Sequence, residues 1–155
     1  MRAALVCAAC VCLAAVIGCG GGDPEAGSGG DAYRNEAQDM PLDELVDDSL
    51  SLDEADRTDW KALEIEDGGQ LAVEFLADEA ETKTFLAVFD RYGTQLGAAQ
   101  RSGGQVSTLS VDVPRGGRYF LVVQALEGPP TAYSVMVSLG AAPGQGGSPT
   151  GRPGF

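Results

Sequence analysis

Histidine is absent from the 155 residues of this chain, and basic side chains are scarce: 10 lysines and arginines face 23 aspartates and glutamates. Without imidazole there is no Ser/His/Asp or Cys/His catalytic site, no histidine-ligated zinc or haem, and no ordinary proton shuttle near neutral pH. The formal net charge of −13 opposes binding to phosphate backbones, which depends mainly on lysine and arginine. Most familiar enzyme types and a nucleic-acid partner are therefore excluded.

Cysteine is confined to the first 19 residues, and three of the four cysteines lie inside an apolar run. Arg2 supplies a positive charge, and residues 3–17 then contain no charged or amide side chain. This run is shorter than the roughly 20 residues of a membrane-spanning helix, and it leads into glycines instead of a stop-transfer cluster. Residues 1–18 are therefore predicted to be a secretory signal peptide. The mature domain is expected to lack disulfides, because no cysteine follows Cys19.

The junction at residues 16–19, Val-Ile-Gly-Cys, resembles the lipobox of bacterial lipoproteins. The resemblance implies cleavage between Gly18 and Cys19, attachment of a diacylglycerol to the Cys19 thiol, and acylation of the new amino terminus with chains such as palmitate. Two or three buried acyl chains anchor far more firmly than a single chain does. The resemblance thus implies a cell-envelope location with the lipid bilayer as a partner through Cys19. Gly20 in the next position resembles an outer-membrane sorting context in a Gram-negative envelope.

Composition divides the remaining chain into a tether, a domain and a tail. Residues 19–40 are rich in glycine and polar side chains and predict a flexible, lipid-anchored tether, because they bury too little apolar surface to offset their conformational entropy. Residues 140–155 repeat this composition with three prolines and predict a disordered tail. The β domain is therefore expected at residues 41–139. Residues 23–60, across its start, carry thirteen acidic side chains and only two arginines.

From Trp60 onward the hydrophobic residues recur with a period of two, and turn residues separate the segments. Seven strands are predicted around residues 63–65, 71–75, 84–89, 94–100, 109–113, 118–125 and 133–139, and the acidic segment offers an eighth. The segment 84–89 is apolar on both faces and is expected to be a central strand. Seven or eight strands predict an all-β fold, an antiparallel jelly-roll-like β-sandwich. The alternative for residues 41–46 is one helical turn.

Three motifs resemble the bacterial pre-peptidase C-terminal domain, a small jelly-roll-like sandwich often appended to secreted proteases. They are DRTDW at 56–60, FDRYGTQL at 89–96, and RGGRYFLVV at 115–123 followed by YSVMV at 133–137, and together they span about 85 residues. The resemblance implies a β-sandwich and an accessory role for a protease. From the residues themselves, Trp60 and Tyr119 are interpreted as packing side chains and the motif glycines as turn residues.

Some domains of this family bind calcium through an acidic amino-terminal segment, and the candidates here are Asp53, Glu54, Asp56 and Asp59. Calcium takes six to eight oxygen ligands, which four carboxylates with carbonyls and water are able to supply. The spacing does not match the helix–loop–helix calcium loop, however. The leading interpretation has no metal and no cofactor, and calcium binding is the alternative.

The leading functional hypothesis is a non-catalytic binding or structural module that meets an envelope protein, a peptide or a glycan. One alternative is a calcium-dependent accessory module for a secreted or envelope protease or glycan. Another is a hydrolase that uses two carboxylates roughly 5 to 10 Å apart. A sandwich of this size has little room for a substrate cleft, so no enzymatic activity is predicted.

Overall fold

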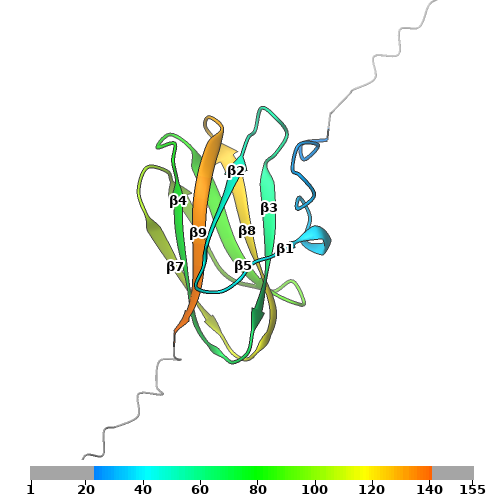
Figure 1. Cartoon of the computed structure of the whole chain (residues 1–155), viewed down its shortest axis with the longest axis vertical. Helices are drawn as coiled ribbons and strands as arrows, with labels where there is room; N and C mark the ends of the chain where they lie inside the picture. Colours follow the sequence, from blue (N-terminus) through cyan, green and yellow to red (C-terminus); the bar gives the residue numbers. More distant parts are fainter. Residues whose placement is uncertain (1–22, 141–155) are drawn as a thin grey trace, which may run out of the picture.

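Two β-sheets packed face to face make up the part of the chain that the computed structural model describes, residues 23–140 (Figure 1). One sheet has the strand order β1-β3-β8-β5-β6 and the other β2-β9-β4-β7. All neighbouring strands are antiparallel except β1 and β3. The predicted all-β sandwich is confirmed. The elements are the 3-10 turn η1 (Arg34–Glu36) and the strands β1 (Gln38–Asp39), β2 (Leu45–Leu50), β3 (Thr58–Ile65), β4 (Gly69–Ala77), β5 (Lys83–Asp90), β6 (Gln95–Ser102), β7 (Ser107–Val113), β8 (Gly117–Glu127) and β9 (Thr131–Gly140).

The hydrophobic core lies between the sheets and is built from alternate residues of the strands. On β4, Leu71, Val73 and Phe75 are buried, while the residues between them are half-buried or exposed. Val73 lies opposite Val137 of β9 and Leu109 of β7, so one row of aliphatic side chains crosses three strands. The period of two produces this row because successive side chains of a strand point to opposite faces.

Strands β5 and β8 lie inside the five-stranded sheet and bury residues on both of its faces. Residues 86–88 of β5 are fully buried, and so are most of residues 121–123 of β8. The expectation that 84–89 forms a central strand is confirmed, since β5 lies between β8 and β6. On the outer face the ring of half-buried Trp60 packs 5.5 Å from that of Phe89. Trp60 is thus a packing side chain, as its position predicts.

The seven predicted strands are present as β3 to β9, and β2 is the eighth, taken from the acidic segment. The helical turn considered for residues 41–46 is wrong. Leu45 and Val46 instead begin β2 and pair with the middle of β9. Asp43, at φ 60°, lies in the preceding turn and donates its N–H to the Val137 carbonyl. By extending the sheet, this segment therefore pairs its backbone N–H and C=O groups in hydrogen bonds.

The packed part of the chain begins earlier than the predicted domain boundary at residue 41. Within the predicted tether, Asp31, Ala32 and Met40 are buried, and β1 adds a short ninth strand beside β3. The Asp31–Lys61 ion pair and backbone hydrogen bonds to β3 hold this segment, and composition does not reveal contacts between distant residues. Residues 1–22 and 141–155, which include the predicted signal peptide, Cys19 and nearly all of the predicted tail, lie outside the described part.

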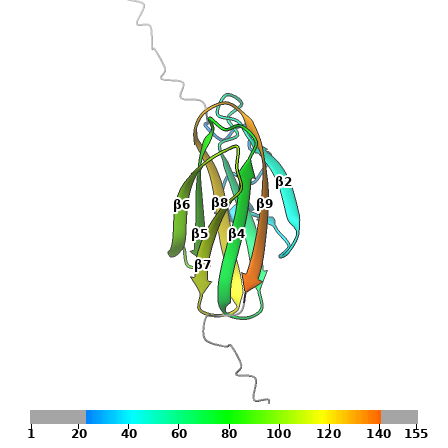
Figure 2. The same cartoon turned by 90° about the vertical axis from the view of Figure 1, so that its left-hand side faces the viewer.

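Residue 23 and Gly140 lie at opposite ends of the sandwich (Figure 1). The β2–β3, β4–β5 and β8–β9 turns lie at the end near residue 23, and the β3–β4, β5–β6 and β7–β8 turns lie at the other (Figures 1 and 2). Within residues 23–140 no helix is long and apolar enough to cross a membrane.

Candidate functional site

A buried lysine joins the amino-terminal segment to the sandwich. Lys61 of β3 is 1 % exposed, and its Nζ donates hydrogen bonds to Asp31 Oδ2 at 2.8 Å, Asp48 Oδ2 at 2.5 Å and Gln38 Oε1 at 3.3 Å. Asp59, two residues earlier on the same face of β3, accepts a 2.5 Å hydrogen bond from the Tyr133 hydroxyl. We call Asp31, Asp48, Asp59 and Lys61 the lysine cluster.

The lysine cluster carries more negative than positive groups, and the pKa values of Asp59 and Lys61 are shifted. Burial raises the pKa of Asp59 to about 8, although the hydrogen bond from Tyr133 acts in the opposite direction. Burial alone would lower the pKa of Lys61, but hydrogen bonds to Asp31 and Asp48 raise it above its usual value. Lys61 therefore stays charged, and Asp59 holds a proton at neutral pH.

The structure separates the four calcium candidates. Asp53 and Glu54 are exposed in the β2–β3 turn, whereas Asp56 is half-buried and Asp59 belongs to the lysine cluster. Burial, with neighbouring carboxylates, raises the pKa of Asp56 to about 6, and its Oδ1 has no hydrogen-bond partner among the described residues.

The carboxylates that do converge are a different set. Within residues 23–140, the one group of three or more whose oxygens all lie within 4.8 Å of one another is Asp31, Asp48 and Asp59. The Lys61 ammonium bonds two of them. The sequence carries one signal of this cluster: Asp59 and Lys61 alternate with Leu63 and so fall on the core face of β3.

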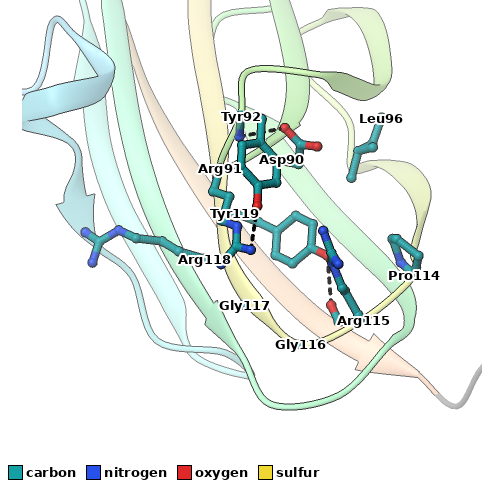
Figure 3. A pocket seen from close by; sticks show the side chains of 10 residues that line it. All are labelled: Asp90, Arg91, Tyr92, Leu96, Pro114, Arg115, Gly116, Gly117, Arg118 and Tyr119. Carbon is teal, nitrogen blue, oxygen red and sulfur yellow. Dashed lines mark hydrogen bonds between the residues drawn. The ribbon is translucent and has the colours of Figure 1, made fainter.

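A small pocket of about 50 Å³ lies at the end of the sandwich far from residue 23, between the β5–β6 and β7–β8 turns (Figure 3). Asp90 Oδ1 shapes the first turn by accepting the N–H groups of Tyr92 and Thr94, each at 2.8 Å. These hydrogen bonds hold the pKa of Asp90 below its usual value. Gly93, at φ 88°, supplies the left-handed conformation that the turn requires.

The pocket floor and rim are aromatic. Tyr119 is buried and donates its hydroxyl to the Arg115 carbonyl at 2.7 Å, while Tyr92 is 68 % exposed and accepts a 2.6 Å hydrogen bond from Arg91 Nη2. Tyr119 is therefore a packing side chain, as predicted. Figure 3 shows the side chains of Arg91 and Arg115 on either side of Tyr119, whereas the Arg118 side chain extends away from the pocket.

Arginines surround the pocket, although Glu66 and Asp67 of the adjoining β3–β4 turn place acidic side chains at the same end. Of the eight lysines and arginines within residues 23–140, Arg91, Arg115 and Arg118 line the pocket, and Arg34 lies beside it. Arg34 Nη1 contacts the Gly93 position, and its guanidinium lies 5.3 Å from the centre of the Phe120 ring. Arg118 is paired with Glu64 and Asp39, but the other three make no ion pair with the described residues.

The pocket offers no pair of carboxylates for hydrolysis. Among its lining residues Asp90 is the one acid, and its lowered pKa is opposite to what a general acid requires. A second depression, of about 190 Å³ on the outer face of the four-stranded sheet, is lined mainly by apolar side chains such as Leu45, Val106 and Met136. It presents few groups that would orient a ligand. We call the pocket between the β5–β6 and β7–β8 turns, which Arg91 and Arg115 line, the basic pocket. It is the candidate binding site.

No protein-family model matches this chain, and no curated protein sequence matches it. Among solved structures, the chain is similar to the pre-peptidase C-terminal domain of collagenase from Bacillus anthracis, with a TM-score of 0.56 and 15 % identity over 66 % of this chain and 94 % of that one. A weaker likeness is to the Yersinia pseudotuberculosis-derived mitogen, with a TM-score of 0.42 and 10 % identity over 74 % of this chain and 99 % of that one. Another is to a β-1,3-glucan-binding family 6 carbohydrate-binding module from Bacillus halodurans, with a TM-score of 0.39 and 14 % identity over 68 % of this chain and 99 % of that one. The sandwich therefore has a fold like that of a pre-peptidase C-terminal domain.

Proposed function

We propose that this chain is a bacterial envelope lipoprotein whose β-sandwich is a non-catalytic binding module. The observation that carries the proposal is the basic pocket, where Arg91 and Arg115 flank Tyr119 beside exposed Tyr92. Neither guanidinium forms an ion pair with a carboxylate of the described residues; Arg91 instead lies 4.7 Å from the centre of the Tyr92 ring and donates a hydrogen bond to its hydroxyl. A few polar groups that converge with aromatic side chains are typical of ligand sites.

Attachment to the bilayer through Cys19 would give this pocket a defined orientation. Four peptide units separate Cys19 from Asp23, and an extended chain spans at most about 14 Å over that distance. The Glu25 carboxylate then accepts hydrogen bonds from the backbone N–H groups of Arg57 and Thr58 at the start of β3. The near end of the sandwich would therefore stay close to the lipid surface. The pocket, at the far end, would face an envelope protein, a peptide or a glycan beyond it.

Titration of the lipid-free mature chain, residues 20–155, with panels of envelope glycans and peptides tests the binding function. Saturable binding should weaken in Arg115→Gln and Tyr92→Ala. Arg57→Gln is the matched control, because Arg57 is exposed in the β2–β3 turn at the other end of the sandwich. Binding that is insensitive to both pocket variants would place the site elsewhere. Turnover of a bound ligand would contradict a non-catalytic role.

A further inference from the structure

We propose that the basic pocket binds the carboxylate of a uronic-acid sugar in an acidic polysaccharide, with the carboxylate between Arg91 and Arg115. This inference rests on the binding function proposed above and names the ligand class of the same site. It follows from the size of the pocket, the charge of its walls and the position of its exposed aromatic ring.

The pocket is too small to enclose a whole sugar. Its volume of about 50 Å³ compares with the roughly 10–15 Å³ of cavity that one water molecule needs and with 300–1,000 Å³ for sites that engulf a ligand. A group the size of a carboxylate fits inside it. The ring that carries the group must lie outside, against the rim.

The charge of the walls selects an anion. Guanidinium groups bind carboxylates through a planar fork of N–H donors, and Arg91 and Arg115 are both free of carboxylate partners among the described residues. Arg34, at the neighbouring Gly93, adds a third positive charge. The net charge of −13 opposes every polyanion, so binding depends on the local charge of these arginines, and one carboxylate per sugar is opposed less than the denser charges of a polyphosphate chain.

The rim favours a polar ring as the carrier of the carboxylate. The Arg91 guanidinium lies 4.7 Å from the centre of the Tyr92 ring, and the exposed remainder of this 68 % exposed side chain offers aromatic surface to a sugar ring that rests on the rim. Asp90 lies on the same rim and stays ionised, so it repels a second anionic group there and accepts hydrogen bonds from hydroxyl donors. A uronic acid combines one carboxylate with several hydroxyls on one ring.

Isothermal titration of residues 20–155 with short oligomers of galacturonate, mannuronate and glucuronate tests this assignment. At least one should bind, and its methyl ester and the matching neutral oligomer should bind at least tenfold more weakly. Arg115→Gln and Arg91→Gln should each weaken binding about tenfold or more, which corresponds to one lost charge-assisted hydrogen bond. Arg57→Gln should bind as the wild type does. Melting curves of the variants check that each remains folded.

The outcomes separate the ligand class from the binding function. If the esters or neutral oligomers bind as tightly as the acids, the carboxylate assignment is overturned while a binding module remains. If inorganic phosphate or a peptide with a free carboxyl terminus binds at the site and no uronate binds there, the ligand class is wrong. If no uronate binds and the wider panels give no ligand, both proposals fail.

Discussion

Replacement of Lys61 by methionine should strongly destabilise the sandwich. The change keeps a long unbranched side chain and removes the positive charge that faces Asp31 and Asp48. Removal of one partner from a buried ion pair typically costs about 3–5 kcal/mol, because the remaining charge stays buried without compensation. The side chain of Asp31 is 3 % exposed and cannot reach water, whereas that of Asp48 is 34 % exposed and can turn outward. We therefore expect the lower end, about 3 kcal/mol.

A loss of this size is a large part of the roughly 5–15 kcal/mol that stabilises a domain. For a domain of this length it corresponds to a decrease in Tm of roughly 12 °C.

Thermal melting of residues 20–155 at pH 7, monitored by circular dichroism, measures the effect. Lys83→Met is the matched control, because Lys83 pairs with Glu127 on the surface, where both side chains are more than half exposed. Such a pair contributes at most about 1 kcal/mol, so the control should lower Tm by no more than about 4 °C. Equal melting temperatures for the two variants at pH 7 would refute the role of the buried ammonium.

Asp59→Asn should flatten the dependence of stability on pH. Burial raises the Asp59 pKa to about 8 in the folded state, so the stabilising contribution of Asp59 is full below about pH 4 and is lost as the pH rises through 8. Identical slopes of stability against pH for the wild type and the variant between pH 5 and 8 would contradict this. Calcium should raise Tm no more than magnesium at matched ionic strength, since the Lys61 ammonium already bonds Asp31 and Asp48. A calcium-specific increase that Asp56→Asn abolishes would instead indicate a calcium site in the acidic segment. Cys19→Ser should leave a larger, unprocessed precursor, and incorporation of labelled palmitate by that variant would exclude Cys19 as the lipidated residue.

Sequence motifs contain the residues of the candidate pocket but do not reveal that these residues lie close together. Both of its halves lie in motifs that are visible in the sequence, residues 89–96 and 115–123, and each is correctly interpreted there as a turn beside a strand. That the two turns face each other depends on the antiparallel pairing of β5 with β8, which sets Asp90 opposite Tyr119. No local pattern encodes this pairing.

The sequence by itself determined the strands and the class of fold, because alternation with a period of two is a local property that any half-buried strand displays. It also contains the contiguous pattern at residues 16–19 from which a lipobox at Cys19 is predicted. The tertiary structure decided the lysine cluster, the early start of the packed chain and the basic pocket. Asp31 and Lys61 are 30 residues apart in the sequence, and they meet because the segment before β1 lies along β3, where the Asp31 carbonyl accepts the Trp60 N–H. Contacts of this kind form between segments that chain folding brings together, and composition and periodicity describe each segment alone.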